Sequence, residues 1–175
     1  LAIADFDNDG DNDVIAAAGA YENQFEEDYK HYLYENRKGY FERIQLPVQP
    51  FIASVIRICD FDHDGDKDIF IGSRIRNGMF PFANRSWLLI NDNGKIISDE
   101  AFSYDLGMVT DALWSDYDND GWEDLIVTRE WNSIAILKNE NGKKLTDQII
   151  PDLKEKQGLW YTLIPGDFDG DGDSD

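Results

Sequence analysis

Short apolar runs alternate with acidic loops along the chain, and this order repeats. The runs show no 3.6-residue period and are bounded by Gly, Asn and Asp, which favours β-strands over helices. The run that follows each complete acidic loop is almost wholly apolar, which is typical of a strand buried on both faces. These runs are Val14-Ile15-Ala16, Ile69-Phe70-Ile71 and Leu125-Ile126-Val127.

The acidic loops share one nine-residue pattern, D-aromatic-D-x-D-G-x-x-D, whose positions we number 1 to 9. The loops begin at Asp5, Asp60, Asp116 and Asp167, so their starts lie 55, 56 and 51 residues apart. Four copies at nearly constant spacing identify an internal repeat. The loops end at Asp13, Asp68, Asp124 and Asp175.

A second marker, N-x-x-G, occurs once in each of the three complete units and reads as a hairpin turn, because Asn and Gly tolerate positive φ. It begins at Asn36, Asn91 and Asn139. Each unit therefore reads as strand, acidic loop, strand, connection, strand, N-x-x-G turn, strand. In the second unit these strands are expected at residues 54–59, 69–73, 86–90 and about 95–98.

Four strands in each unit of roughly 50 residues are the arrangement of a β-propeller blade. We predict an all-β fold: a single partial β-propeller of four-stranded antiparallel blades, with a calcium-binding loop between the first and second strand of each blade. The expected blades cover about residues 1–46, 47–101 and 102–152, with the start of a fourth at 153–175. The remaining blades are expected elsewhere in the same protein.

The charge of the chain follows the repeat. The formal net charge is −20, and the four loops hold 20 of the 36 acidic residues; the other 16 match the 16 Lys and Arg residues. The excess charge is therefore local, which indicates sites that concentrate negative charge. The sequence has no basic stripe, which argues against nucleic acid as a partner. No apolar stretch is long enough to insert into a membrane. The single cysteine excludes a disulfide scaffold.

The loops predict calcium sites, because Ca²⁺ prefers about six to eight oxygen ligands. Gly at position 6 permits a sharp turn, so that carboxylates at positions 1, 3, 5 and 9 converge and position 7 offers its carbonyl. We expect about four Ca²⁺ ions, one per loop. The proposed side-chain ligands are Asp5, Asp7, Asp9 and Asp13; Asp60, Asp62, Asp64 and Asp68; Asp116, Asp118, Asp120 and Asp124; and Asp167, Asp169, Asp171 and Asp175. The proposed carbonyl ligands belong to Asp11, Asp66, Trp122 and Asp173.

Two alternatives exist for these loops. An EF-hand needs Glu at position 12 and flanking helices, but position 12 is Ala16, Ile71 or Val127 and a β-type run follows. Solvated acidic turns are the other alternative, and four carboxylates in one tight loop repel each other strongly without a cation. We further expect the aromatic residues at position 2 (Phe6, Phe61, Tyr117 and Phe168) and Cys59 to lie in the core, and His63 to be exposed.

These residues resemble the FG-GAP/VCBS repeats of integrin α-subunit propellers and of secreted bacterial proteins. Within that group they are most similar to ASPIC/UnbV-type, cartilage-acidic-protein-like proteins, through Gly107 to Trp114 running into Asp116 and through Glu130-Trp131. The resemblance implies a calcium-bearing propeller that acts in adhesion, in protein or carbohydrate binding, or as an accessory domain.

A ligand face is expected at the end opposite the calcium loops, because alternate connections of a meander share one end. Long loops on a rigid scaffold often carry function, and aromatic residues beside Arg suit recognition. The alternative is that these aromatic residues only pack the loops onto the propeller. The candidates are Tyr21, Phe25, Tyr29, Arg74, Arg76, Phe80, Phe82, Arg129 and Trp131.

Binding or scaffolding is favoured over catalysis. Only two histidines are present, G-x-S-x-G is absent, and most clustered acids are assigned to metal. The alternative function is the propeller of a secreted carbohydrate-active lyase or hydrolase. Weak oxygen-ligated calcium sites fill at extracellular calcium levels, so we expect an extracellular, cell-surface or periplasmic protein whose partner is a protein or a glycan.

Overall fold

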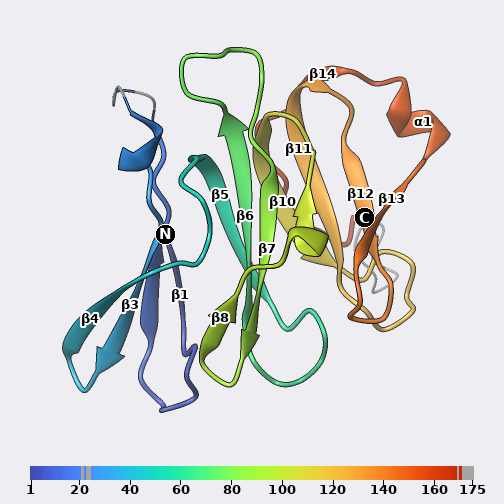
Figure 1. Cartoon of the computed structure of the whole chain (residues 1–175). Helices are drawn as coiled ribbons and strands as arrows, with labels where there is room; N and C mark the ends of the chain where they lie inside the picture. Colours follow the sequence, from blue (N-terminus) through green and yellow to red (C-terminus); the bar gives the residue numbers. More distant parts are fainter. Residues whose placement is uncertain (21, 23–24, 169, 171–175) are drawn as a thin grey trace.

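The computed structural model describes residues 1–20, 22, 25–168 and 170. It is all-β and consists of three antiparallel sheets that follow one another along the chain (Figure 1). The first sheet has the order β1-β2-β3-β4. Its strands are β1 (Ala2–Ala4), β2 (Asp13–Ala16), β3 (Tyr32–Arg37) and β4 (Tyr40–Gln45).

The second and third sheets repeat this order. The second contains β5 (Ile52–Cys59), β6 (Asp68–Ile75), β7 (Ser86–Asp92) and β8 (Lys95–Ile97), and β9 (Ser103–Tyr104) pairs with β7. The third contains β10 (Val109–Ser115), β11 (Asp124–Asn132), β12 (Ala135–Asn139) and β13 (Leu145–Gln148), and β14 (Gly158–Leu159) pairs with β11. The sheets are propeller blades, and the strands predicted for the second blade match β5 to β8.

Helical segments are short. They are the 3₁₀ turns η1 (Glu26–Asp28) and η2 (Glu100–Phe102) and the single α-helical turn α1 (Pro151–Lys154). Among the described residues, none of these helices is long and apolar enough to cross a membrane.

The core lies between the blades, and the second strand of the middle blade, β6, faces it on both sides. Along β6, Ile69 and Ile71 pack into the cluster shared with the first blade, whereas Phe70 packs into the cluster shared with the third. All three side chains are fully buried. This alternation explains why Ile69, Phe70 and Ile71 are all apolar, since each face of this sheet meets a neighbouring blade.

Close contact between blades depends on Gly72. A Cβ atom at this position would lie 2.7 Å from the Cγ1 atoms of both Val55 and Val109. Strand β10 of the third blade therefore approaches the backbone of β6, and a larger residue at position 72 would force the blades apart.

The position-2 aromatic residues only partly match their prediction. Phe6 and Phe61 are buried in the two inter-blade clusters, and Cys59 is buried with them, as predicted. Tyr117 is half-buried and Phe168 is 81% exposed, so neither is covered like Phe6 and Phe61 in the described part of the chain. The reason is that each of these rings is covered by the following blade, and the described residues contain no blade after the third.

Candidate metal sites

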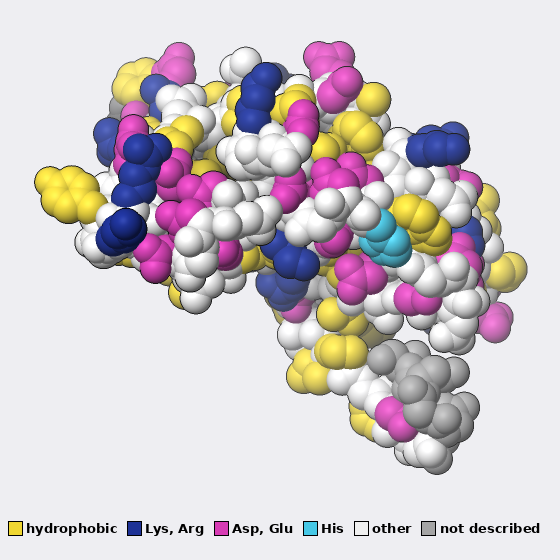
Figure 2. Space-filling model, turned by 90° about the horizontal axis from the view of Figure 1, so that it is seen from below, with side chains coloured by type: hydrophobic (Ala, Val, Ile, Leu, Met, Phe, Trp, Pro, Cys, Tyr) yellow, Lys and Arg dark blue, Asp and Glu magenta, His cyan; other side chains and the backbone are white. Residues whose placement is uncertain are grey.

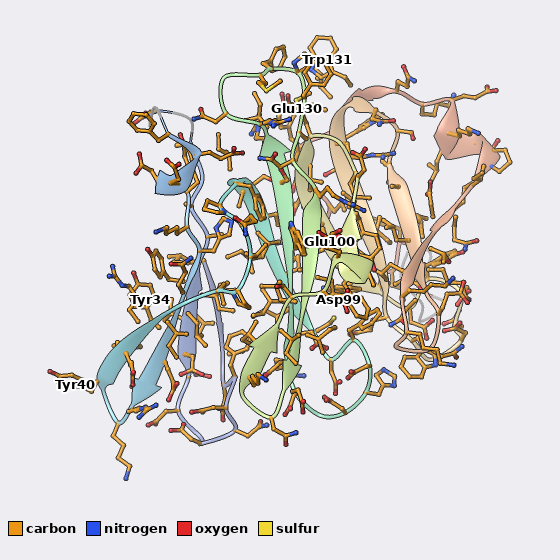
Figure 3. All side chains as sticks on the ribbon, in the orientation of Figure 1. Tyr34, Tyr40, Asp99, Glu100, Glu130 and Trp131 are labelled. Atoms are coloured by element: carbon orange, nitrogen blue, oxygen red, sulfur yellow. The ribbon has the colours of Figure 1, made fainter. Side chains whose placement is uncertain are left out.

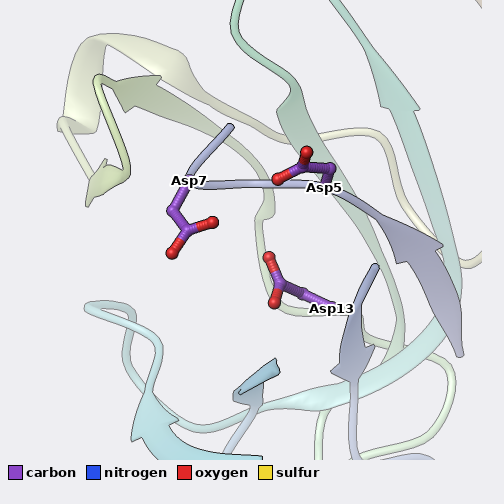
Figure 4. A group of neighbouring side chains, drawn as sticks. All are labelled: Asp5, Asp7 and Asp13. Atoms are coloured by element: carbon purple, nitrogen blue, oxygen red, sulfur yellow. The ribbon is translucent and has the colours of Figure 1, made fainter. Parts of the chain in front are cut away.

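The acidic loops and the N-x-x-G turns share one end of the molecule, the lower end in Figure 1. Figure 2 shows this end from below, with Asp and Glu side chains spread over it. In each of the three complete loops the carboxylates at positions 1, 3 and 9 offer oxygen atoms that all lie within 4.8 Å of one another. The clusters are Asp5, Asp7 and Asp13 (Figure 4); Asp60, Asp62 and Asp68; and Asp116, Asp118 and Asp124.

Backbone geometry brings these carboxylates together. The position-6 glycines have positive φ, for example 95° at Gly10 and 98° at Gly65, as the sharp turn requires. The residue at position 4 is also left-handed, with φ of 60° at His63. The position-1 carboxylate then closes the turn: Oδ2 of Asp5 accepts the N–H of Gly10 at 2.9 Å. The second and third loops repeat this bond.

The carboxylate at position 9 ties each loop to its hairpin turn. Oδ2 of Asp68 accepts the backbone N–H of Phe61 at 2.7 Å, and Oδ1 accepts that of Asn91 at 2.8 Å. Asp13 makes the equivalent bonds in the first blade. All three position-9 carboxylates are fully buried, so the loop, the second strand and the N-x-x-G turn form one rigid unit.

Burial makes negative charge unfavourable at the clusters. It raises the pKa of Asp68 to about 7, although two backbone N–H groups stabilise the charged form. Burial likewise raises the pKa values of Asp7, Asp62 and Asp124. A cation bound between the carboxylates would reverse this effect.

The donor set fits a hard divalent cation. Every clustered side chain offers carboxylate oxygen, the ligand that Ca²⁺ and Mg²⁺ prefer. In addition, Asp60 Oδ1 and Asp124 Oδ2 are buried without a hydrogen-bond partner of good geometry in the described part of the chain. A buried carboxylate oxygen without a partner is costly, and a bound cation would satisfy it.

The other predicted ligands make further contacts in the structure, and their ligand roles stay predictions. The position-5 carboxylates, Asp9, Asp64 and Asp120, lie outside the three clusters and accept the N–H of position 7. The carboxylates of Asp11 and Asp66 accept N–H groups of the hairpin turns. The carbonyl roles of Asp11, Asp66 and Trp122 stay predictions.

The fourth loop is described only in part. Asp167 Oδ1 accepts the N–H of Gly170 at 2.6 Å. The other predicted ligands of this loop, Asp169, Asp171, Asp173 and Asp175, lie outside the described residues.

Comparison with known families identifies the repeat. The sequence model for FG-GAP-like repeats matches residues 5–71 and 116–175, which is more than half of the chain. The chain belongs to the FG-GAP-like repeat family. A comparison with curated proteins found no match.

Sequence reasoning missed a contact that links one FG-GAP-like blade to the next. The side-chain amide of Asn91, the first residue of the second N-x-x-G turn, donates to the carbonyl oxygen of Phe6 in the first loop at 2.8 Å. Its Oδ1 accepts the N–H of Gly94 in its own turn. The recurrence of Asn in all three turns was the available signal, but a hairpin turn alone accounts for Asn there.

The predicted ligand face lies at the opposite end, where Figure 3 shows Glu130 and Trp131. Phe25, Arg76, Phe80, Phe82 and Trp131 are exposed there, whereas Tyr21 is outside the described residues. Tyr29 must be removed from this set: it is 1% exposed, because the first connection folds against Phe51, whose N–H donates to the Tyr29 carbonyl.

The arginines at this end are held by the fold. Arg129 donates to the carbonyls of Ser133 and Leu106, which gives it a structural role. Arg74 of the second blade forms an ion pair with the nearly buried Glu130 of the third. This pair lines a cavity of about 540 Å³ between the two blades, together with Ile75, Asn77, Gly78, Phe80 and Met108.

Proposed function

We propose that this segment is a calcium-binding β-propeller module, with one Ca²⁺ ion in each acidic loop. The observation that carries this proposal is the convergence of three carboxylates, one of them fully buried, in each of the three fully described loops. Calcium is favoured over zinc because the donor set is oxygen only. It is favoured over Mg²⁺ because a loop rich in carboxylates and carbonyls supplies many protein ligands, whereas Mg²⁺ usually keeps several waters.

The proposed compartment follows from the proposed affinity. Oxygen-ligated calcium loops range from roughly 10⁻⁶ to 10⁻³ M, and the weaker sites fill only at extracellular calcium levels. We therefore place the module outside the cytosol, in a secreted or surface protein.

Calorimetry with CaCl₂ tests the proposal, using wild type, Asp62→Ala and Asp92→Ala. Asp62 belongs to the second cluster, so its variant is expected to lose one bound ion. Asp92 is exposed on the adjoining hairpin turn, outside the clusters, and its variant is expected to keep wild-type stoichiometry. No binding by the wild type at millimolar calcium would overturn the proposal.

At the opposite end we propose a surface for a glycan or protein ligand. In support, Trp131 is 63% exposed and has φ of +61°. Positive φ is strained for a bulky residue, and such strain clusters at functional sites. Glu130, the residue before Trp131, lines one cavity with Arg74 and the exposed Phe80, so apolar and polar groups occur together there, the combination found at recognition surfaces.

Binding to a panel of immobilised neutral oligosaccharides tests the glycan arm. Trp131→Ala is expected to reduce the signal, while Phe41→Ala, which removes an exposed aromatic ring from β4, is expected to leave it unchanged. If the wild type binds no glycan, the proposal of a glycan ligand is rejected. Equal binding by both variants and the wild type would place the ligand surface elsewhere.

A further inference from the structure

One position beside the metal clusters carries a different charge in each blade. In each blade, the strand register aligns the position-9 aspartate with the residue that precedes the Asn of the N-x-x-G turn, since Val14 pairs with Tyr34, Ile69 with Leu89 and Leu125 with Leu137. The residues that face Asp13, Asp68 and Asp124 are Glu35, Ile90 and Lys138, which are negative, neutral and positive.

Lys138 brings its charge into the third cluster. Its ammonium group donates to Oδ2 of Asp118, a member of the cluster, and to Oδ2 of Asp120 at 2.7 Å. This contact lowers the pKa of Asp120, so the lysine already stabilises the negative charge of the loop. In the second blade the same position holds Ile90, and in the first blade Glu35 is paired with Arg37 at 2.6 Å.

The third loop nevertheless retains the features of a metal site. Asp116, Asp118 and Asp124 converge as in the other loops. Asp124 is fully buried, and its Oδ2 atom has no hydrogen-bond partner of good geometry among the described residues. Lys138 makes no hydrogen bond to this atom, so the ammonium group neutralises the outer part of the cluster and leaves the inner oxygen available to a cation.

A divalent ion and the ammonium group would therefore compete for Asp118. Two cations a few ångströms apart repel each other, and the repulsion is stronger near a low-dielectric surface than in bulk water. Calcium binding requires Lys138 to leave Asp118 or to bear this repulsion. No lysine or arginine contacts the cluster carboxylates of the first or second loop in the described residues.

We propose that Lys138 acts as a resident cation that weakens calcium binding at the third loop and keeps this loop ordered when calcium is low. The inference rests on the proposed function, because it assumes that the other loops bind Ca²⁺. It predicts calcium sites of unequal affinity within one propeller, with the third loop filling after the second.

Reciprocal exchange of the two residues tests the proposal. Lys138→Ile copies the second blade, and Ile90→Lys copies the third. Calorimetry with CaCl₂ gives the affinities of the bound ions, and the same titration of Asp118→Ala, which lacks a carboxylate of the third cluster, identifies the third-loop affinity. We expect Lys138→Ile to tighten binding at the third loop by about tenfold or more, and Ile90→Lys to weaken the second loop by a similar factor.

Lys143→Ile is the matched control, because it removes an exposed lysine from the turn of the same hairpin; it is expected to leave both affinities unchanged. Circular dichroism confirms folding, and Lys138→Gln replaces Lys138→Ile if the latter unfolds. Wild-type protein that binds no Ca²⁺ would reject the proposed function itself. The other outcome is that the wild type binds Ca²⁺ in its loops but neither Lys138 variant changes the affinity of the third loop. That result would overturn this inference and leave the proposed function standing.

Discussion

The side-chain amide of Asn139 donates to the main-chain carbonyl of Phe61 at 3.0 Å, and so joins the third hairpin turn to the second acidic loop. The two residues are separated by 78 positions in the chain. Asn91 makes the same contact with Phe6. Each N-x-x-G turn of the second and third blades is therefore hydrogen-bonded to the acidic loop of the blade before it, and these loops are parts of the inter-blade contact.

Removal of the bond from Asn139 to Phe61 is expected to destabilise the protein. Asn139→Ala leaves the buried Phe61 carbonyl and the N–H of Gly142 without partners, at a cost of about 2–3 kcal/mol in the free energy of unfolding. Asn36→Ala is the matched control. Asn36 caps its own turn but donates to Asn12 within its blade, so about 1 kcal/mol is expected. Urea unfolding at saturating calcium measures the difference between the two variants. Equal losses of unfolding free energy would show that the bond from Asn139 to Phe61 does not stabilise the contact between blades.

The glycine of the turn is expected to link blade packing to calcium affinity. A Cβ atom at Gly142 would lie 2.7 Å from the Cα atom of Asp62, a ligand candidate of the second loop. Gly142→Ala should therefore displace Asp62 and weaken calcium binding there, in addition to the roughly 1–2 kcal/mol cost of left-handed backbone.

Gly39→Ala separates these two effects. Gly39 also has positive φ, at 90°, but a Cβ atom there would meet nothing within 4 Å. It should show the conformational cost in urea unfolding and no loss of calcium affinity in calorimetry. If both variants bind calcium like the wild type, packing against Asp62 does not control the second loop.

Features set by local sequence were predictable. The glycine at position 6 and the N-x-x-G turns require left-handed backbone, and the apolar run at Ile69 to Ile71 requires two buried faces; the structure has both. The clusters at positions 1, 3 and 9 also follow from the spacing, because the chain reverses between positions 5 and 7.

Contacts that depend on how blades stack could not be read from one repeat. The bond from Asn139 to Phe61 needs the next blade in place, and so does the burial of Phe61. Tyr29 looked like a surface residue because it lies in a long polar connection, but that connection folds back onto the first core. The charge of Lys138 matters only because the strand register places it at the third loop.

Asp66 is expected to stabilise the fold without binding metal through its side chain. Its carboxylate accepts the N–H of Asn93 at 2.6 Å and the side-chain amide of Asn8, in the first loop, at 2.7 Å. Asp66→Ala should lower the free energy of unfolding by about 2–3 kcal/mol, with calcium stoichiometry unchanged. In the first blade, Asp11 accepts from Lys38 in its own turn.

Asp11→Ala is therefore the control, with an expected cost of about 1 kcal/mol. Urea unfolding gives the two costs and calorimetry counts the bound ions. Loss of one ion in a folded Asp66→Ala variant would assign the carboxylate, rather than the carbonyl, to the metal.

Buried His31 is expected to make stability depend on pH. Its Nδ1 atom accepts the N–H of Ala18 at 3.1 Å, its ring lies 4.5 Å from that of Phe51, and Nε2 is buried without a partner among the described residues. Burial lowers the pKa of this histidine to about 4, from an ordinary value of 6.5. The folded protein therefore keeps His31 neutral in a pH range where the unfolded chain protonates it.

The sign of the effect follows from this difference. Above pH 6.5 His31 is neutral in both the folded and the unfolded protein, so protonation of His31 does not reduce the free energy of unfolding. As the pH falls from 6.5 to about 4, the unfolded state binds the extra proton, and stability decreases by up to about 3 kcal/mol. Below about pH 4 the folded state also protonates, and the contribution of His31 stops changing.

Urea unfolding of wild type and His31→Gln at several pH values isolates this contribution, because the carboxylates titrate in both proteins and cancel in the difference. Gln retains an acceptor for Ala18 but does not titrate. The advantage of the wild type over the variant should shrink steadily between pH 6.5 and 4 and stay constant above pH 7. A difference that is independent of pH would show that His31 is protonated as readily in the folded protein as in the unfolded chain.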